Sequence, residues 1–193
     1  MSSKFFREEV DAAVDALLMQ QVILYPTDTV WGLGCDAEVP RAVEQVYRLK
    51  QRPAEKACIV LVADEGMFAR YAEVVPPNLT ELLAAQTRPT TYVVPGSRHL
   101  APNLLAPDGT IGLRVVQTDE FCQKVVRRLG HGLVSTSANL SGDPTPGLFS
   151  EINPVLVRNA DYVAHWRQQD ETRASPSRVV RVRADGTLEV LRD

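Results

Sequence analysis

Apolar residues in this chain recur with two periods, which predict helices and strands mixed along its length. Over 4–20 they return every three or four residues, the spacing of an amphipathic helix. The short apolar run 22–25 predicts a strand that Pro26 ends. Residues 27–34 predict a loop, because their glycines allow turns or a close approach of backbone to a ligand.

A second helix is predicted to begin at Pro40, because proline suits the first helical turn. It should end near Lys50, since Pro53 disfavours helical backbone at Arg52. The continuous apolar run 58–62 then predicts a strand that is covered on both faces.

The pattern continues in the same mixed way to the C-terminus. Helices are predicted at 64–72, 77–86, 118–129 and 148–158, and strands at 91–94, 110–116, 132–135 and 178–183. The last of these strands should form a hairpin with 188–191 through Asp185-Gly186. Residues 165–177 show no clear period and predict a mobile loop, a candidate lid. Together these elements predict an α/β fold with a mixed sheet flanked by helices, in one domain over 1–193.

Composition and charge narrow the class of protein. With 45% hydrophobic and 23% charged residues, the chain has the composition of an ordinary soluble globular protein. The net charge of −3 argues against nucleic acid as the main ligand, although the 21 lysines and arginines could still gather on one face. The N-terminus becomes charged before any signal-like apolar stretch, and no stretch approaches membrane-spanning length. We therefore expect no membrane association.

The cysteines and histidines offer no metal site at the level of sequence. Three cysteines, Cys35, Cys58 and Cys122, lie in apolar surroundings without metal-ligand spacing, which predicts reduced core residues in a cytoplasmic protein. The histidines share no spacing with each other or with a cysteine pair, which predicts surface or loop positions for His99, His131 and His165. Walker, dinucleotide, nucleophile-elbow and zinc signatures are also absent from the sequence.

A short basic cluster follows the predicted second helix. Lys50, Arg52 and Lys56 fall within seven residues, offset only by Glu55. Two like charges about 6 Å apart at an effective dielectric of about 20 repel by roughly 3 kcal/mol, so a cleft that gathered them would call for an anion. On a convex surface the cluster needs no anion, and Lys50 simply complements the helix dipole. Charge alone favours the surface interpretation.

A polar segment follows the predicted strand 132–135. Ser137 and Asn139 are two residues apart, so they point the same way if the backbone is extended. A hydroxyl and a carboxamide could then hold a phosphate oxygen, a ribose hydroxyl or a base edge. The other interpretation is a local turn, in which such side chains bond to nearby backbone.

Two further positions bear on ligand binding. The run Thr27-Asp28-Thr29 could bind a small polar ligand or could cap turns. Arg114 lies among apolar residues of a predicted central strand, so it needs an anionic partner, either an internal carboxylate or a ligand phosphate. The residues alone therefore predict an α/β domain with a candidate anion and nucleotide pocket.

The order and spacing of four segments resemble the YrdC family, the L-threonylcarbamoyladenylate synthases, in its short bacterial form. The segments are Tyr25–Gly34, Lys50-x-Arg52 with Lys56, Gly112–Val115 and Ser135–Gly142. The resemblance covers about residues 8–183, and the pairing of K-x-R with S-x-N is more specific than either half. It implies a twisted α/β fold around a large concave cavity.

The resemblance also implies a reaction. L-threonine, bicarbonate and ATP would give threonylcarbamoyl-AMP and pyrophosphate, with Mg²⁺ carried by ATP. A tRNA-threonylcarbamoyl transferase complex would then pass the threonylcarbamoyl group to an adenosine beside the tRNA anticodon. Fixed cations would stabilise the charge that builds on the phosphates. Lys50 and Arg52 are the implied catalytic cations, and Lys56 joins them in binding substrate.

Other residues would bind the substrates. The resemblance assigns Thr27 to threonine and the Ser137–Asn139 pair to the nucleotide, with Ser135 and Arg114 nearby and Ser177 close to both substrates. The chain departs from the family pattern at Trp31, Arg88, Cys58 and Arg178, where Arg88 and Arg178 could alter the cavity rim. The alternative function is a non-catalytic protein that binds double-stranded RNA or rRNA in a basic cavity, with strongly salt-dependent affinity.

Overall fold

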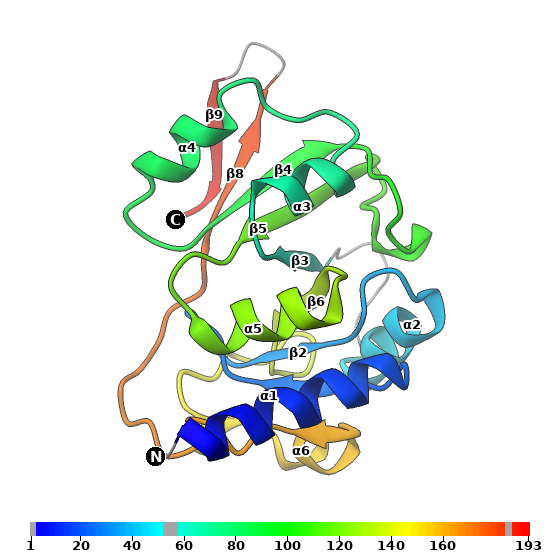
Figure 1. The fold of residues 1–193 in the computed structure, drawn as a ribbon, viewed down its shortest axis with the longest axis vertical. Helices are drawn as coiled ribbons and strands as arrows, with labels where there is room; N and C mark the ends of the chain where they lie inside the picture. The colour runs from blue at the N-terminus through cyan, green and yellow to red at the C-terminus, as the bar shows by residue number, and fades with distance from the viewer. Residues whose placement is uncertain (1–2, 52–57, 184–186) are drawn as a thin grey trace.

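The computed structural model describes residues 3–51, 58–183 and 187–193 (Figure 1). The helices are α1 Ser3–Leu18, α2 Pro40–Leu49, α3 Glu65–Tyr71, α4 Leu79–Ala85, α5 Glu120–Leu129 and α6 Pro154–Asn159, with 3-10 turns η1 Pro102–Leu104 and η2 Phe149–Glu151. The strands are β1 Ile23–Tyr25, β2 Gly32–Gly34, β3 Ile59–Val62, β4 Thr90–Pro95, β5 Thr110–Val115, β6 Leu133–Ser137, β7 Tyr162–Val163, β8 Arg178–Val182 and β9 Leu188–Arg192.

The strands of the described residues form one mixed sheet in the order β7-β1-β2-β6-β3-β5-β4-β8-β9. The pairs β7/β1, β3/β5 and β4/β8 are parallel, and the other neighbouring pairs are antiparallel. The sheet twists strongly between the β1/β2 end and the β8/β9 end (Figure 1). The predicted α/β class with a twisted mixed sheet is confirmed.

Most predicted elements are present within a few residues of their predicted bounds, and the differences have local causes. Strand β2 lies inside the predicted loop 27–34. Its Gly-Leu-Gly sequence has little strand propensity, so the pattern did not predict it, and pairing with β1 and β6 holds it as a strand. At Gly34 an added Cβ would lie 1.8 Å from the carbonyl oxygen of Val134, so only glycine fits there. The predicted helix 148–158 is instead η2 followed by α6, which Asn153 caps through a 2.9 Å bond from the Val155 N–H.

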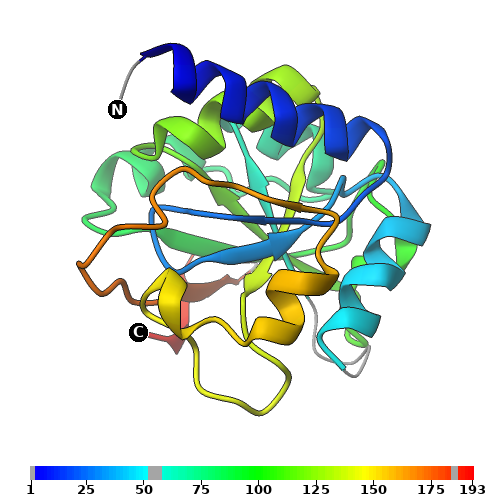
Figure 2. The ribbon, with the colours of Figure 1, turned by 90° about the horizontal axis from the view of Figure 1, so that it is seen from below.

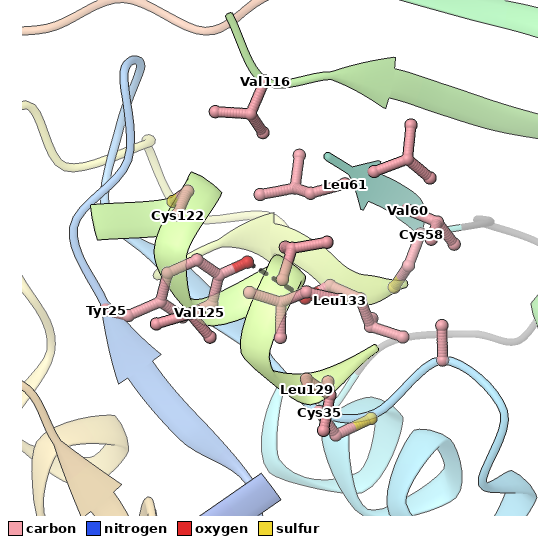
Figure 3. Packing of buried hydrophobic residues seen from close by; sticks show 14 of the residues in the cluster. Tyr25, Cys35, Cys58, Val60, Leu61, Val116, Cys122, Val125, Leu129 and Leu133 are labelled. Carbon is pink, nitrogen blue, oxygen red and sulfur yellow. Dashed lines mark hydrogen bonds between the residues drawn. The ribbon is translucent and has the colours of Figure 1, made fainter. Parts of the chain in front are cut away.

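Helix α5 shows how the sequence specifies the packed face. Asp119 caps its N-terminus by accepting from the Cys122 N–H at 2.7 Å, and Gly130 ends it with φ of 74°. The apolar side chains of α5 pack against the sheet beside those of β3 and β6, as Figure 3 shows for Val125 and Leu129. The three cysteines are free and buried, which confirms their prediction as core residues. Figure 2 shows α1 and α5 on one side of the sheet and α6 on the other.

The strands carry different side chains on their two faces. In β5, Ile111 and Leu113 are buried in the core, while Thr110, Gly112 and Arg114 line a cavity. Successive strand residues point to opposite faces, so one strand serves both surfaces. This alternation places the polar positions of β5 on the side away from the packed core.

Candidate active site

A cavity of about 570 Å³ occupies the polar side of the sheet. Its walls come from the loop before β2, from β5 and β6, and from the β8/β9 hairpin at the far end. The residues with polar side chains that line it are Thr29, Trp31, Cys58, Asp108, Thr110, Arg114, Ser135, Thr136, Ser137, Thr145, Ser177, Arg181 and Arg192. A volume of this size suits a small-molecule ligand.

The charges on the described wall of the cavity are mainly positive. Arg114, Arg181 and Arg192 line it from β5, β8 and β9, and Asp108 is the carboxylate among the described lining residues. Asp108 lies 3.1 Å from Arg181. Burial lowers the pKa of the Arg192 guanidinium, and the positive charge of Arg114 lowers it further. An anionic ligand in the cavity would offset the repulsion that Arg192 receives from Arg114.

Sequence reasoning missed Arg181 and Arg192. The one available signal for Arg181 was its place in the predicted strand 178–183, where every second residue shares a face, and Arg192 lies one residue beyond the predicted strand 188–191. That pattern does not tell which face of the hairpin closes the cavity. The pairing of β8 with β4 decides this.

Arg114 is buried, with 1% of its surface exposed, and it does have an internal carboxylate as partner. Its Nη2 lies 3.1 Å from Asp28 Oδ1, and its Nη1 donates to Thr29 Oγ1 at 3.0 Å. The internal carboxylate, one of the two partners predicted for this arginine, is therefore present. The guanidinium also lines the cavity, so it can face a ligand from a fixed position.

The Thr27–Thr29 loop holds its hydroxyls in a defined order. Thr27 Oγ1 donates to the Val30 carbonyl at 2.8 Å and accepts from the Thr29 N–H at 2.9 Å. The 2.9 Å contact between the two hydroxyls must therefore use the Thr29 proton. Thr29 lines the cavity, whereas Thr27 lies behind it as a support. Direct binding of threonine by Thr27 stays a prediction.

Lys50 brings the two signature segments together. Its Nζ donates to the backbone carbonyls of Ser137 and Asn139, the latter at 2.6 Å, although Lys50 and Ser137 are 87 positions apart in the chain. Its own carbonyl accepts from the Ser141 N–H at 2.9 Å. The end of α2 is thereby joined to the loop after β6. Arg52 and Lys56 lie outside the described residues, so their roles also stay predictions.

The Ser137–Asn139 pair combines both interpretations of its sequence. Ser137 Oγ donates to Asn139 Oδ1 at 2.5 Å, so the two side chains do lie on one side. Asn139 Nδ2 also donates to the carbonyls of Leu140 and Asp143, as a local turn requires. Ser137 lines the main cavity, and Asn139 lines a neighbouring hollow that shares Thr145 with it.

Ser135, on β6, and Ser177, just before β8, also line the cavity. Ser177 Oγ lies 3.0 Å from Thr91 Oγ1, and its carbonyl accepts from Nη2 of Arg192 at 2.8 Å. Ser177 therefore orients an arginine of the wall as well as presenting its own hydroxyl.

Of the four departures from the family pattern, Trp31 and Cys58 line the cavity, whereas Arg88 and Arg178 do not. Arg88 and Arg178 each lie within ion-pair distance of Asp193, at 3.4 and 3.3 Å, and neither lines the cavity. Trp31 lines it and packs against Phe149 with ring centroids 4.8 Å apart. The histidines lie at surface or loop positions as predicted: His99 and His165 are exposed, and His131 lies half-buried in the loop before β6, beside Asp36.

Comparison with known proteins agrees with this fold. The Sua5/YciO/YrdC family model, described as "Telomere recombination", matches residues 15–193. A threonylcarbamoyl-AMP synthase of Stenotrophomonas maltophilia is 36% identical over 79% of this chain and 83% of its own. The structure of Escherichia coli YciO matches 97% of this chain and 89% of its own, with a TM-score of 0.82 and 26% identity. The chain belongs to the Sua5/YciO/YrdC family.

A more distant structure shows the same fold. P. abyssi Sua5, solved in complex with L-threonine, has a TM-score of 0.76 at 22% identity, covering 89% of this chain and 50% of its own.

None of the helices in the described residues is both long enough and apolar enough to span a bilayer.

Proposed function

We propose that this protein is a threonylcarbamoyl-AMP synthase. The proposal depends on one observation. The arginine-lined cavity is bordered at Ser137 by the loop that Lys50 holds through the carbonyls of Ser137 and Asn139. The curated threonylcarbamoyl-AMP synthase cited above covers most of the chain and supports the same activity. L-threonine, bicarbonate and ATP are the proposed substrates, and pyrophosphate is the second product.

The reaction makes demands that this cavity can meet. The threonine amine and bicarbonate form a carbamate with loss of water, and a carbamate oxygen then attacks the α-phosphorus of ATP. The bond to the leaving oxygen breaks, so negative charge gathers on pyrophosphate and on the α-phosphoryl oxygens. Fixed cations aimed at these oxygens stabilise the transition state. An enclosed site also keeps water from the carbamate and from the mixed anhydride.

The positions of the residues suggest which part of the substrates each would bind. Arg114 and the Thr29 hydroxyl form one polar wall with Ser135, suited to the carboxylate and amine of an amino acid. Ser137 lies where the cavity meets the Lys50 wall, suited to the nucleotide. Lys50 shapes this wall by holding two carbonyls, and Arg52 and Lys56 are proposed to complete the phosphate site.

ATP would enter with Mg²⁺ as part of the substrate. Magnesium usually binds through substrate phosphates, waters and one or two carboxylates, rather than in an all-protein cage. Within the described ranges, no group of three or more His, Cys, Asp or Glu side chains could hold a metal ion, and Asp108 is the carboxylate on the cavity wall. These residues fit a metal carried by the nucleotide.

The product would pass to a tRNA-threonylcarbamoyl transferase complex in the cytoplasm, a compartment consistent with three free, buried cysteines.

RNA binding is less well supported as the main function. The arginines of the site line an inward cavity, whereas a duplex is bound through a surface that spans successive grooves.

The deciding experiment follows pyrophosphate release from ATP and bicarbonate, with and without L-threonine. We expect release that requires threonine and that is lost in Lys50→Ala and Arg52→Ala. Arg48→Ala is the matched control, because Arg48 is an exposed cation of α2, two positions before Lys50, and is paired with Glu44. Release that ignores threonine would refute the synthase. Full activity in both variants would remove the two cations from the mechanism.

A further inference from the structure

The 165–177 segment runs from the end of β7 to the start of β8 (orange in Figure 1). Its first residues are fixed by a buried carboxylate on α1. Glu9 Oε2 accepts from the backbone N–H of His165 at 2.5 Å and of Trp166 at 3.2 Å, and from the Tyr162 hydroxyl at 3.0 Å. Trp166 also packs on Phe6, with ring centroids 4.7 Å apart. The segment therefore begins as an anchored piece of backbone.

The guanidinium of Arg167, the next residue, contacts the Thr27–Thr29 loop. Its Nη1 donates to the carbonyl of Thr27 at 3.0 Å and to Asp119 Oδ2 at 3.1 Å, and its Nε donates to Asp170 Oδ2 at 2.6 Å. The backbone of Arg167 has φ of 65°, a conformation that side-chain-bearing residues rarely adopt. The anchored segment and the three contacts together hold this conformation.

A continuous set of contacts joins Arg167 to the cavity. Arg167 holds the Thr27 carbonyl, the Thr27 hydroxyl accepts the hydroxyl and the N–H of Thr29, and Thr29 Oγ1 accepts from Arg114. The inner end of this path lines the cavity and the outer end lies on the 165–177 segment. The loop is thus held from both sides by arginines.

We infer that Arg167 is a positioning residue for the amino-acid half of the site. It sets the Thr27–Thr29 loop so that the Thr29 hydroxyl and the Arg114 guanidinium face the threonine carboxylate and amine. The inference rests on the proposed function, because it assumes that this wall binds the amino acid. The planar fork of arginine reaches a carbonyl and two carboxylates at once, which a lysine ammonium on a flexible stem does not reproduce.

The test compares Arg167→Ala with Arg167→Lys in pyrophosphate-release kinetics. Loss of the outer contact should raise the KM for L-threonine about tenfold in Arg167→Ala, because displaced binding groups weaken substrate binding without removing it. The KM for ATP should not change, since the nucleotide wall is held by Lys50. Arg167→Lys should recover part of the loss. Arg128→Ala is the matched control, because it removes an exposed arginine in the last turn of α5, at the opposite end from Asp119, where it pairs with Asp11 of α1.

The outcomes separate this inference from the proposed function. Wild-type protein without threonine-dependent release would overturn both. Active wild-type protein with an unchanged threonine KM in Arg167→Ala would overturn the inference alone. Equal increases in both KM values, or the same change in Arg128→Ala, would also overturn it, because they indicate a general loss of structure. Thermal melting of each variant identifies those that fail to fold, and Arg167→Lys then decides.

Discussion

Leu113 and Arg114 are neighbours on β5, yet they belong to opposite surfaces of the sheet. Leu113 lies within the apolar core, and its 0% exposure is matched by the 1% of Arg114. Leu113 is held by packing, whereas Arg114 is held by one carboxylate and one hydroxyl. These two side chains are therefore equally buried, but the interactions that stabilise them differ. At Leu113 the protein loses stability when side-chain volume is removed, whereas at Arg114 it loses stability when a buried charge is left without its partner.

The strongest test of this comparison removes the charge on the cavity face. Arg114→Met should lower the free energy of unfolding by about 3–5 kcal/mol, because it leaves Asp28 buried without its partner. The double variant Asp28→Asn with Arg114→Met should regain most of that stability and remain inactive with threonine. Denaturant unfolding and pyrophosphate release measure the two effects. A double variant as unstable as the single would mean that packing, rather than charge, holds Arg114.

The matching change on the packed face is Leu113→Ala. It should lower the free energy of unfolding by about 2–5 kcal/mol through lost burial and a residual cavity. Below its melting temperature the variant should keep the wild-type KM values, since Leu113 faces away from the site. Leu188→Ala on the exposed edge strand is the control, with little expected change. An altered threonine KM in Leu113→Ala would show that the two faces are coupled.

A smaller effect on the cavity face is expected from Ser137→Ala. Removing the bond to Asn139 should cost about 1 kcal/mol of stability or less, whereas the KM for ATP should rise about tenfold if the hydroxyl binds a nucleotide oxygen. Ser150→Ala, at an exposed position, is the control. A raised threonine KM with an unchanged ATP KM would place the serine on the amino-acid side instead.

The smallest effect concerns Asp119, which lies behind the cavity. Burial raises the pKa of its carboxyl above 3.8, as does the charge of Asp28, while the Cys122 N–H and Arg167 oppose the shift. The folded state therefore binds this proton more readily than the unfolded state. Stability should fall as pH rises from about 3.8 to the raised pKa, and the penalty stays above it.

Asp119→Asn should remove this contribution, because asparagine keeps a cap acceptor without titrating. The free energy of unfolding of the variant minus that of the wild type should rise with pH across the same window. Urea unfolding at a series of pH values measures that difference. A difference that stays flat or falls would contradict the raised pKa.

Most of the fold was predictable from local patterns. Apolar periodicity found the helices and the longer strands, because each buries one face and so repeats with its own period. It missed β2 and β7, which have only three and two residues and are held by neighbouring strands. The single predicted helix 148–158 became two pieces, because capping at Asn153 starts a new helix.

The candidate site was predictable in part. Arg114 needed an anionic partner by its chemistry, and the structure identifies Asp28 among the possible partners. Ser137 and Asn139 were correctly placed on one side, but their division between two hollows depends on the path of the following loop. Arg167 carried no local signal, and the strand alternation around Arg181 did not tell which face closes the cavity, because exposed and cavity-facing arginines look alike in a sequence.

The sequence by itself determined the alternation of helices and strands, the apolar core and the two signature segments, since each depends on residues close together in the chain. The tertiary structure alone decided that Lys50 meets the Ser137–Asn139 loop and that a terminal hairpin supplies two arginines to the cavity. Contacts of this kind join residues far apart in sequence, and they depend on strand order and sheet twist. No local pattern encodes either one.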